Sequence, residues 1–231
     1  MPVNGNRILA SLPPDEYDRL RPHLFRRALT VGDILHPSKQ PIDSVYFPFS
    51  GVCSFTLTMQ DGRTVEVGTV GNEGIAGMAL YYQGSFGESQ TVVQVGGGEA
   101  DGMRAGLFLA EMDRRGALHQ LVQRYSQALV TLIMQSVACN ALHDVPQRAA
   151  RWLLMTHDRV GSDAFELTQE YLAAMLGVRR PTVTVIAREL QNKGLITYQR
   201  RRIRITDRRG LERMSCECYG VVRKEFARLT P

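Results

Sequence analysis

The stretch that decides the fold is residues 168–190, TQEYLAAMLGVRRPTVTVIAREL. Thr168 is a favourable N-cap residue for a first helix. Gly177 stands where the chain must turn sharply with a left-handed residue. Pro181 suits the first turn of a second helix, because the N–H that it lacks would have no partner there. This pattern predicts a helix-turn-helix, whose second helix enters the major groove of DNA.

The two predicted helices leave a set of polar side chains outside their packed face. Val183, Ile186 and Leu190 are spaced to pack the second helix onto the first. Guanidinium and hydroxyl groups on the opposite side suit both base edges and phosphate oxygens. The predicted DNA contacts from this segment are Thr168, Gln169, Arg179, Arg180, Thr182, Thr184 and Arg188.

A basic hairpin is predicted directly after the second helix. Residues 195–198 and 203–206 alternate as two short strands, joined through residues 199–202. Residues 193–213 hold eight basic and two acidic side chains, which is hard to explain as the solvated edge of an ordinary helical hairpin. The order predicts a winged helix, with Arg200, Arg201 and Arg202 as further DNA contacts.

The charge of the chain is divided unevenly. The 231 residues carry a net charge of +5, but residues 1–144 have 11 basic and 14 acidic groups, whereas residues 145–231 have 17 and 9. This asymmetry favours a polyanionic partner for the last third, and double-stranded DNA is the one that the motif indicates. No apolar run reaches the roughly 20 residues that cross a bilayer, so we expect a soluble, cytoplasmic protein without a membrane role.

The N-terminal half has the pattern of an antiparallel β-structure. Residues 30–95 are rich in short segments of β-branched and aromatic residues, and Asp61-Gly62 predicts a tight hairpin between residues 54–59 and 64–70. The first 25 residues indicate a short helical lead-in. We therefore predict a sandwich or barrel, preceded by helices.

A long helix of about 27 residues is predicted after Gly116, followed by a hinge at residues 140–146 around Pro146. Its apolar stripe could pack on the β-domain or on a second copy of itself. Heptad spacing over about three repeats favours a homodimer. The stripe consists of Leu118, Val122, Tyr125, Leu129, Leu132 and Ser136.

These features together resemble the Crp/Fnr family, that of the cyclic-AMP receptor protein and the fumarate and nitrate reductase regulator. The resemblance is strongest where T-x3-LA-x2-LGV is followed by Arg, Thr-Val and Gly-Leu-Ile within residues 168–196. It implies an α+β fold with an N-terminal double-stranded β-helix (a jelly-roll-like β-roll, 1–115), a dimerisation helix and hinge (116–144) and a winged helix-turn-helix (145–231). It also implies a dimeric transcription regulator that binds a two-fold operator and contacts RNA polymerase.

Departures from the family pattern concern the effector. Where cyclic-AMP-binding members have a ribose-binding Glu, this chain has Met78, and Ser89 or Gln90 takes the place of the phosphate-binding Arg. Loss of a charge-assisted bond to a buried phosphate removes about 2 kcal/mol or more. We expect no cofactor and no cyclic-AMP binding of the usual kind. The degenerate cassette is Gly74, Gly77, Met78, Ser89 and Gln90.

The recognition helix also departs from the best-known members. Pro181 replaces a base-reading Glu and Val185 replaces a second Arg, so we do not expect the usual operator sequence.

Neither a metal site nor a catalytic site is predicted. Cysteine ligands of the iron–sulfur members lie near the N-terminus, but no cysteine precedes Cys53 here. Cys216 and Cys218 are two thiols without further evident ligands, and we interpret them as ordinary buried or surface residues. The protein is not expected to be an enzyme. The rival hypothesis is a small-molecule-binding or cupin-like β-roll with a basic oligomerisation tail.

Overall fold

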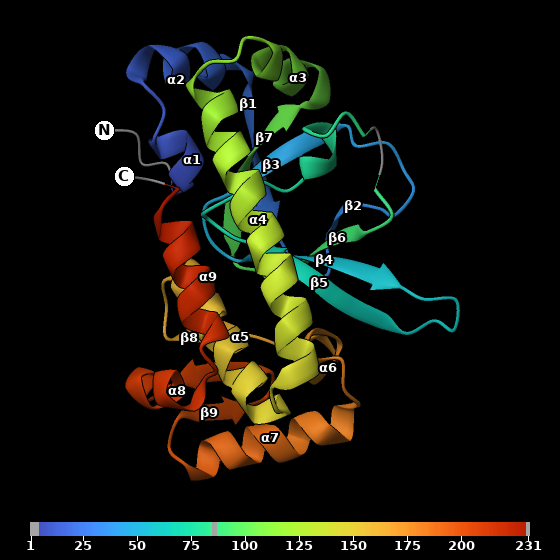
Figure 1. Ribbon diagram of the computed structural model, residues 1–231, viewed down its shortest axis with the longest axis vertical. Coiled ribbons are helices and arrows are strands. Elements are labelled where there is room, and N and C mark those ends of the chain that lie inside the picture. Colours follow the sequence, from blue (N-terminus) through green and yellow to red (C-terminus); the bar gives the residue numbers. More distant parts are fainter. Residues whose placement is uncertain (1–4, 85–86, 230–231) are drawn as a thin grey trace.

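A computed structural model describes residues 5–84 and 87–229. It is a mixed fold of helices and antiparallel sheets, so the expected α+β class is confirmed. Figure 1 shows a β-roll in the upper part, a winged helix-turn-helix at the bottom and a long helix, α4, that runs from the top of the molecule down to the C-terminal part. No helix in the described ranges combines the length and hydropathy that a membrane span requires.

The β-roll comprises two antiparallel sheets. One sheet has the strand order β1-β7-β3, and the other has the order β2-β6-β4-β5. The hairpin predicted at Asp61-Gly62 is confirmed, and Gly62 has the positive φ of +82° that such a turn needs. The strands are β1 (Leu24–Leu29), β2 (Ile34–His36), β3 (Ser44–Pro48), β4 (Val52–Thr58), β5 (Thr64–Val70), β6 (Gln90–Val95) and β7 (Gly98–Arg104).

Strand β1 was not predicted, because the expected helical lead-in ended at residue 25 and the expected strands began at about residue 30. Arg26 and Arg27 interrupt the apolar pattern of this segment, so its sequence does not predict a strand. Arg26 instead pairs across to the neighbouring strand β7, with Glu99 at 3.2 Å and Asp101 at 3.4 Å. On this face of β1, cross-strand ion pairs therefore stabilise the sheet in place of the apolar contacts on which a strand prediction relies. The lead-in itself contains α1 (Arg7–Ala10), α2 (Pro14–Leu20) and the 3₁₀ turn η1 (Arg21–His23).

The long helix α4 (Ala117–Leu142) has 26 residues, close to the predicted length. Its first turn is capped from a distance, because the carboxylate of Glu16 accepts hydrogen bonds from the N–H groups of Ala117 (2.7 Å) and Leu118 (3.1 Å). A carboxylate at this end satisfies free N–H groups and suits the helix dipole. The short helices η2 (Met78–Leu80) and α3 (Ala105–Asp113) precede α4.

The C-terminal domain, residues 145–229, begins directly after the link His143-Asp144. Pro146 does not break the helix but lies in the first turn of α5, and the Asp144 side chain caps that turn through the N–H of Gln147 at 2.9 Å. Strand β8 was not predicted; it extends the wing to a three-stranded sheet, β8-β10-β9. The elements are α5 (Val145–Val160), β8 (Ala164–Glu166), α6 (Gln169–Leu176), α7 (Arg180–Asn192), β9 (Ile196–Gln199), β10 (Arg202–Ile205), α8 (Arg208–Met214) and α9 (Cys218–Ala227).

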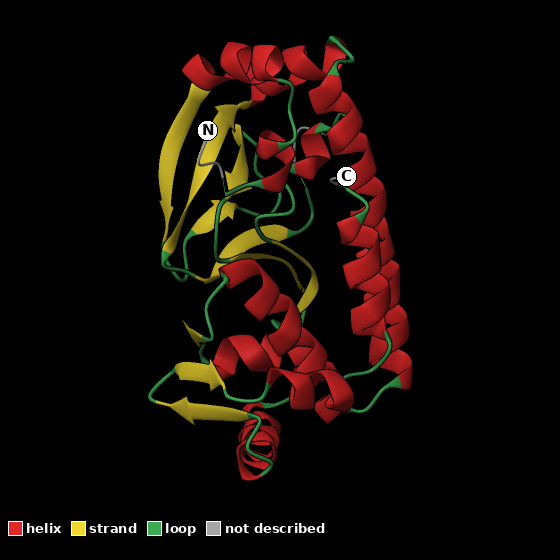
Figure 2. Cartoon of the chain, turned by 90° about the vertical axis from the view of Figure 1, so that its left-hand side faces the viewer, coloured by secondary structure: helices red, strands yellow, loops and turns green. Residues whose placement is uncertain are grey.

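The apolar stripe of α4 faces its own chain, which corrects its assignment to a dimer seam. In Figure 2, α4 runs along one side of the molecule, next to the β-roll and the C-terminal domain. The stripe contacts these parts and α9, and the rings of Tyr125 and Phe226 lie 6.3 Å apart. A side chain buried in this way cannot reach a second copy. The five apolar members Leu118, Val122, Tyr125, Leu129 and Leu132 are at most 7% exposed, and Ser136 accepts a bond from Arg151.

A buried ion pair joins the β-roll to the C-terminal domain. Arg159 of α5 donates from Nη2 (2.7 Å) and Nε (2.9 Å) to one carboxylate oxygen of Glu73, and from Nη1 to the hydroxyl of Thr69 (2.6 Å). Both charged side chains are only about 5% exposed. The bonds satisfy the arginine from both sides, so removal of either charged partner from the folded chain would leave the other charge buried without a partner.

We expect Glu73→Gln to lower the free energy of unfolding by about 3–5 kcal/mol, because it leaves the guanidinium of Arg159 buried without a counter-charge. Urea unfolding measures the change. The matched control is Glu88→Gln, which breaks an exposed pair with Lys39 and should cost less than about 1 kcal/mol. Equal losses in the two variants would contradict the importance of the buried pair.

Candidate functional site

The predicted helix-turn-helix is present, and its local signals act as expected. The hydroxyl of Thr168 caps α6 by accepting the N–H of Tyr171 at 3.1 Å. Gly177 ends that helix with a φ of +60°, which favours glycine. Pro181 lies in the first turn of α7. The corner of the motif is therefore specified by residues within the motif itself.

Helix α7 presents its polar face to solvent. Val183, Ile186 and Leu190 are at most 4% exposed, so they form the packed side of the helix. α7 lies at the end of the molecule farthest from α2 and α3 (Figures 1 and 2), and the described part of the chain leaves its outer face exposed. All five candidates on or next to this helix are exposed: Arg179, Arg180, Thr182, Thr184 and Arg188.

The wing carries arginines at its tip. Arg200 and Arg201 connect β9 to β10, and both have a positive φ, of +48° and +70°. A two-residue hairpin turn with both residues left-handed matches the twist of the strands, although it is normally made by Asn or Gly. Arg202 follows as the first residue of β10 and is exposed. The turn thus projects a compact group of positive charges away from the sheet.

A concave surface connects the start of α6 with the wing. It has a volume of about 440 Å³ and brings together five predicted residues from three elements: Thr168, Gln169, Arg180, Arg200 and Arg201. Glu170, which sequence analysis did not select, also lines it and pairs with Arg180 at 2.8 Å. Gln169 accepts a further bond from the Nε of Arg180 at 3.2 Å. Gln169 and Glu170 of α6 therefore hold the guanidinium of Arg180 in place.

The degenerate cassette lies only partly in one cavity. A cavity of about 180 Å³ between the β-roll and α4 is lined by Gly77, Met78 and Ser89, together with apolar side chains such as Phe55 and Leu129. None of its described lining residues is a lysine, arginine, aspartate or glutamate.

Among the described residues that line this cavity, His36 is the only titratable one. Burial lowers the pKa of His36, which favours the neutral ring. Its Nε2 lies 2.8 Å from the carbonyl oxygen of Ser44 and is therefore the nitrogen that donates. The described lining of the cavity thus has polar atoms but no cation to hold a phosphate.

Two residues of the degenerate cassette, Gly74 and Gln90, do not line this cavity and are part of the packing and the sheet instead. Gly74 lies against Tyr125, and a Cβ atom there would come within 2.1 Å of the ring. Gln90 is the first residue of β6 and pairs with Thr56 in the sheet. The cavity in this part of the fold therefore involves Gly77, Met78 and Ser89 but not Gly74 or Gln90.

Residues 147–214 match the family model of the Crp-like helix-turn-helix domain. A Crp/Fnr-family transcriptional regulator from Eubacterium rectale superimposes with a TM-score of 0.68 at 17% identity, covering 91% of this chain and 98% of that one. A CRP-family regulator from Thermus thermophilus gives 0.68 at 20% identity, with 83% and 96% covered. The c-di-GMP-responsive global regulator CLP from Xanthomonas campestris gives 0.65 at 17%, with 84% and 100% covered.

The chain has the Crp/Fnr fold. Its C-terminal part carries a Crp-like helix-turn-helix domain, so the resemblance found in the sequence is confirmed. No curated protein matches the chain.

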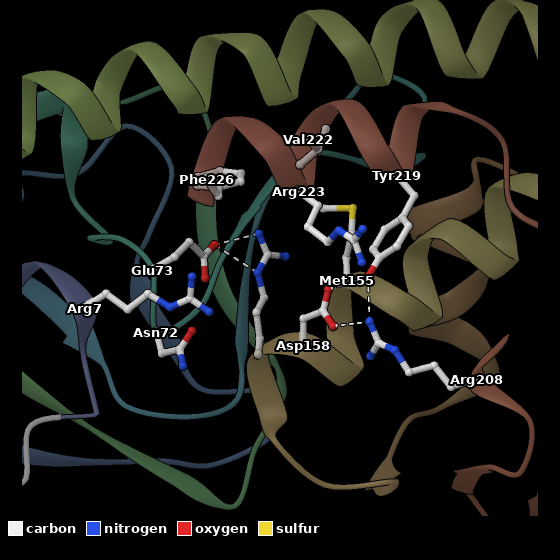
Figure 3. A pocket seen from close by; sticks show the side chains of 11 residues that line it. Arg7, Asn72, Glu73, Met155, Asp158, Arg208, Tyr219, Val222, Arg223 and Phe226 are labelled. Atoms are coloured by element: carbon white, nitrogen blue, oxygen red, sulfur yellow. Dashed lines mark hydrogen bonds and ion pairs between the residues drawn. The ribbon is translucent and has the colours of Figure 1, made fainter. Parts of the chain in front are cut away.

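A second cavity, of about 320 Å³, lies between the β-roll and the Crp-like domain. Figure 3 shows Arg7, Asn72 and Glu73 on one side, facing Asp158 and Arg208 on the other. Sequence analysis missed this cavity because its lining comes from segments far apart in the chain.

The charged groups of this second cavity are largely paired with each other. Arg208 contacts Asp158 at 2.7 Å and donates to the hydroxyl of Tyr219 at 2.6 Å, and that hydroxyl donates to Asp158 at 2.8 Å. Burial and the bond to Asp158 raise the pKa of Tyr219 to about 12, so the phenol keeps its proton. This network ties α5, α8 and α9 of the C-terminal domain to one another.

Three of the four cysteines gather at the far end of α4, although they are scattered in the sequence. Cys139, Cys216 and Cys218 form a small buried cluster separate from the main core, and His143 joins it. The spacing of Cys139 and His143, four residues apart on one helix, was a signal that sequence analysis did not use.

Proposed function

We propose that this protein is a dimeric, sequence-specific DNA-binding transcription regulator that does not depend on cyclic AMP. The observation that carries the proposal is the exposed polar face of α7 beside a wing tipped by Arg200 and Arg201. These groups lie in the third of the chain that carries a net charge of +8 (17 basic minus 9 acidic residues). Selection of bound duplexes from a random DNA pool tests the proposal and identifies the operator.

A regulator and the rival cupin-like protein differ in how they respond to salt. Neutralised phosphates release counterions, so the affinity of a regulator for duplex DNA falls steeply as salt rises while a sequence-dependent part persists. A protein whose basic tail serves only oligomerisation would keep no sequence preference. In the proposed role, the bound regulator acts on RNA polymerase in the cytoplasm.

The dimer interface of this proposal lies on the outer face of α4. Val130, Met134 and Val137 are 47%, 67% and 67% exposed, and Ala141 continues the same spacing of four and three residues. Such a stripe is the seam of a two-helix coiled coil. Two parallel copies would present two α7 helices to half-sites about 34 Å apart, which is one turn of DNA.

We expect Val137→Arg to convert the dimer into a monomer, because it places a charge at the centre of the apolar seam. Size-exclusion chromatography with light scattering gives the mass. Val221→Arg, at an exposed position of α9, is the matched control and should leave the dimer intact. A dimer that survives Val137→Arg would refute this seam.

Two arginines should differ in their effect on DNA recognition. Arg180, at the start of the recognition helix, should contact base edges, so Arg180→Ala is expected to cost about 1–3 kcal/mol on the operator and much less on random DNA. Arg201, at the wing tip, should contact phosphates, so Arg201→Ala should weaken both alike. Fluorescence anisotropy with the operator and random duplexes measures, for each variant, the ratio of the loss of affinity on the operator to the loss on random DNA. Equal ratios would overturn this placement of helix and wing.

Cyclic AMP should neither bind at micromolar concentration nor alter affinity for the selected operator. The described residues that line the cavity beside Met78 and Ser89 offer no positive group for a cyclic phosphate, and an unpaired buried anion is strongly disfavoured. Isothermal titration calorimetry with the full chain measures this directly. A micromolar dissociation constant would contradict the cyclic-AMP independence.

A further inference from the structure

We propose that the chain binds one zinc ion in a tetrahedral site, formed by the side chains of Cys139, His143, Cys216 and Cys218. These four residues are called the thiol–imidazole cluster below. The proposal does not depend on DNA binding, because it rests on the geometry at the far end of α4.

The spacing of the ligand atoms fits a single metal ion. The Sγ atoms of Cys139 and Cys216 are 3.5 Å apart, and the Sγ of Cys218 lies 3.5 Å from the Nδ1 of His143. All four ligand atoms lie within 4.8 Å of one another. Zinc bonds of about 2.3 Å to sulfur and about 2.0 Å to nitrogen place tetrahedral ligand atoms roughly 3.5–3.8 Å apart. The cluster therefore needs only small side-chain adjustments to enclose zinc.

Two distant segments supply the ligands in pairs. Cys139 and His143 stand one turn apart, at the last turn and C-cap of α4. Cys216 and Cys218 flank Glu217, directly before and at the start of α9. The three cysteines are at most 4% exposed, so the site is closed to solvent in the manner of a structural zinc site.

The surroundings of the cluster orient its ligands. The Nε2 of His143 lies 3.2 Å from a carboxylate oxygen of Glu217, which places the ring proton on Nε2 and leaves Nδ1 free to bind a metal. Gln135 donates from its amide to the Sγ of Cys218 at 3.0 Å. The guanidinium groups of Arg148 and Arg151 interact electrostatically with Cys139. Three thiolates and one zinc ion leave a net charge of −1, which these two cations would offset.

The ligand set favours zinc over other occupants. Three thiolates and one imidazole are soft ligands, which excludes magnesium and calcium. An iron–sulfur cluster spreads its protein ligands over two or four irons, so it would need some of the thiols to lie farther apart than they do. A bound zinc ion would tie the end of α4 to the start of α9, next to the two-residue link to α5. It would thereby hold the C-terminal domain against the proposed dimer helix.

The test measures metal content in the full-length protein, purified under reducing conditions without chelators. We expect one zinc ion per chain by mass spectrometry of the metal. After exchange, cobalt(II) alone should give the intense visible bands of a tetrahedral thiolate site. Neither readout involves DNA. Cys218→Ser should lose both the zinc ion and the cobalt bands. The matched control is Cys53→Ser, because Cys53 is buried in β4 away from the cluster. This control should retain both.

A second, conservative variant keeps the test decisive if the cysteine variant misfolds. Glu217→Gln removes only the carboxylate behind His143, so its fold should persist while zinc affinity, measured by chelator competition, falls about 10- to 100-fold. Four outcomes would overturn the proposal: a wild-type chain without stoichiometric zinc or a cobalt–thiolate spectrum, iron with acid-labile sulfide, a Cys139–Cys216 disulfide in place of metal, or unchanged zinc content in Cys218→Ser.

Discussion

The buried pair between Arg159 and Glu73 is the interaction on which the arrangement of the two domains depends. It links α5 of the Crp-like domain to the loop after β5, and Thr69 completes the shell around the guanidinium. Buried charges are tolerated only when every partner is present, because the low-dielectric interior penalises an unpaired ion far more than it rewards a paired one. The domains therefore share one core, which continues from the β-roll through α4 into α5.

Helix α4 separates two kinds of contact. Its inner stripe is buried by the β-roll and by α9, so it serves the fold of a single chain. Its outer face changes along its length, from Gln120, Gln123 and Gln127 to the exposed apolar group around Met134. The apolar part lies closest to the link with the C-terminal domain and to the thiol–imidazole cluster. A signal that altered helix pairing would therefore act near the connection to the recognition helix.

Features specified by neighbouring residues were predicted correctly. The N-cap at Thr168, the left-handed Gly177 and the first-turn Pro181 each act within one or two turns of the chain, so their effect can be read without the rest of the molecule. Strand β1 was missed for the opposite reason, because Arg26 is stabilised by Glu99 across the sheet, more than 70 residues away. The periodicity of the apolar residues also located the inner stripe of α4, but it did not show that the β-roll and α9 of the same chain bury that stripe.

The amino-acid order alone thus specified the helix-turn-helix, the basic wing and a cassette without its phosphate-binding arginine, because each depends on residue type and local spacing. Tertiary structure decided which surface the stripe of α4 contacts, how Glu16 caps that helix and where three cysteines meet His143. These features join segments about 70 to 100 residues apart. Spacing along a chain does not determine which distant segments become neighbours, since that depends on how the whole core packs.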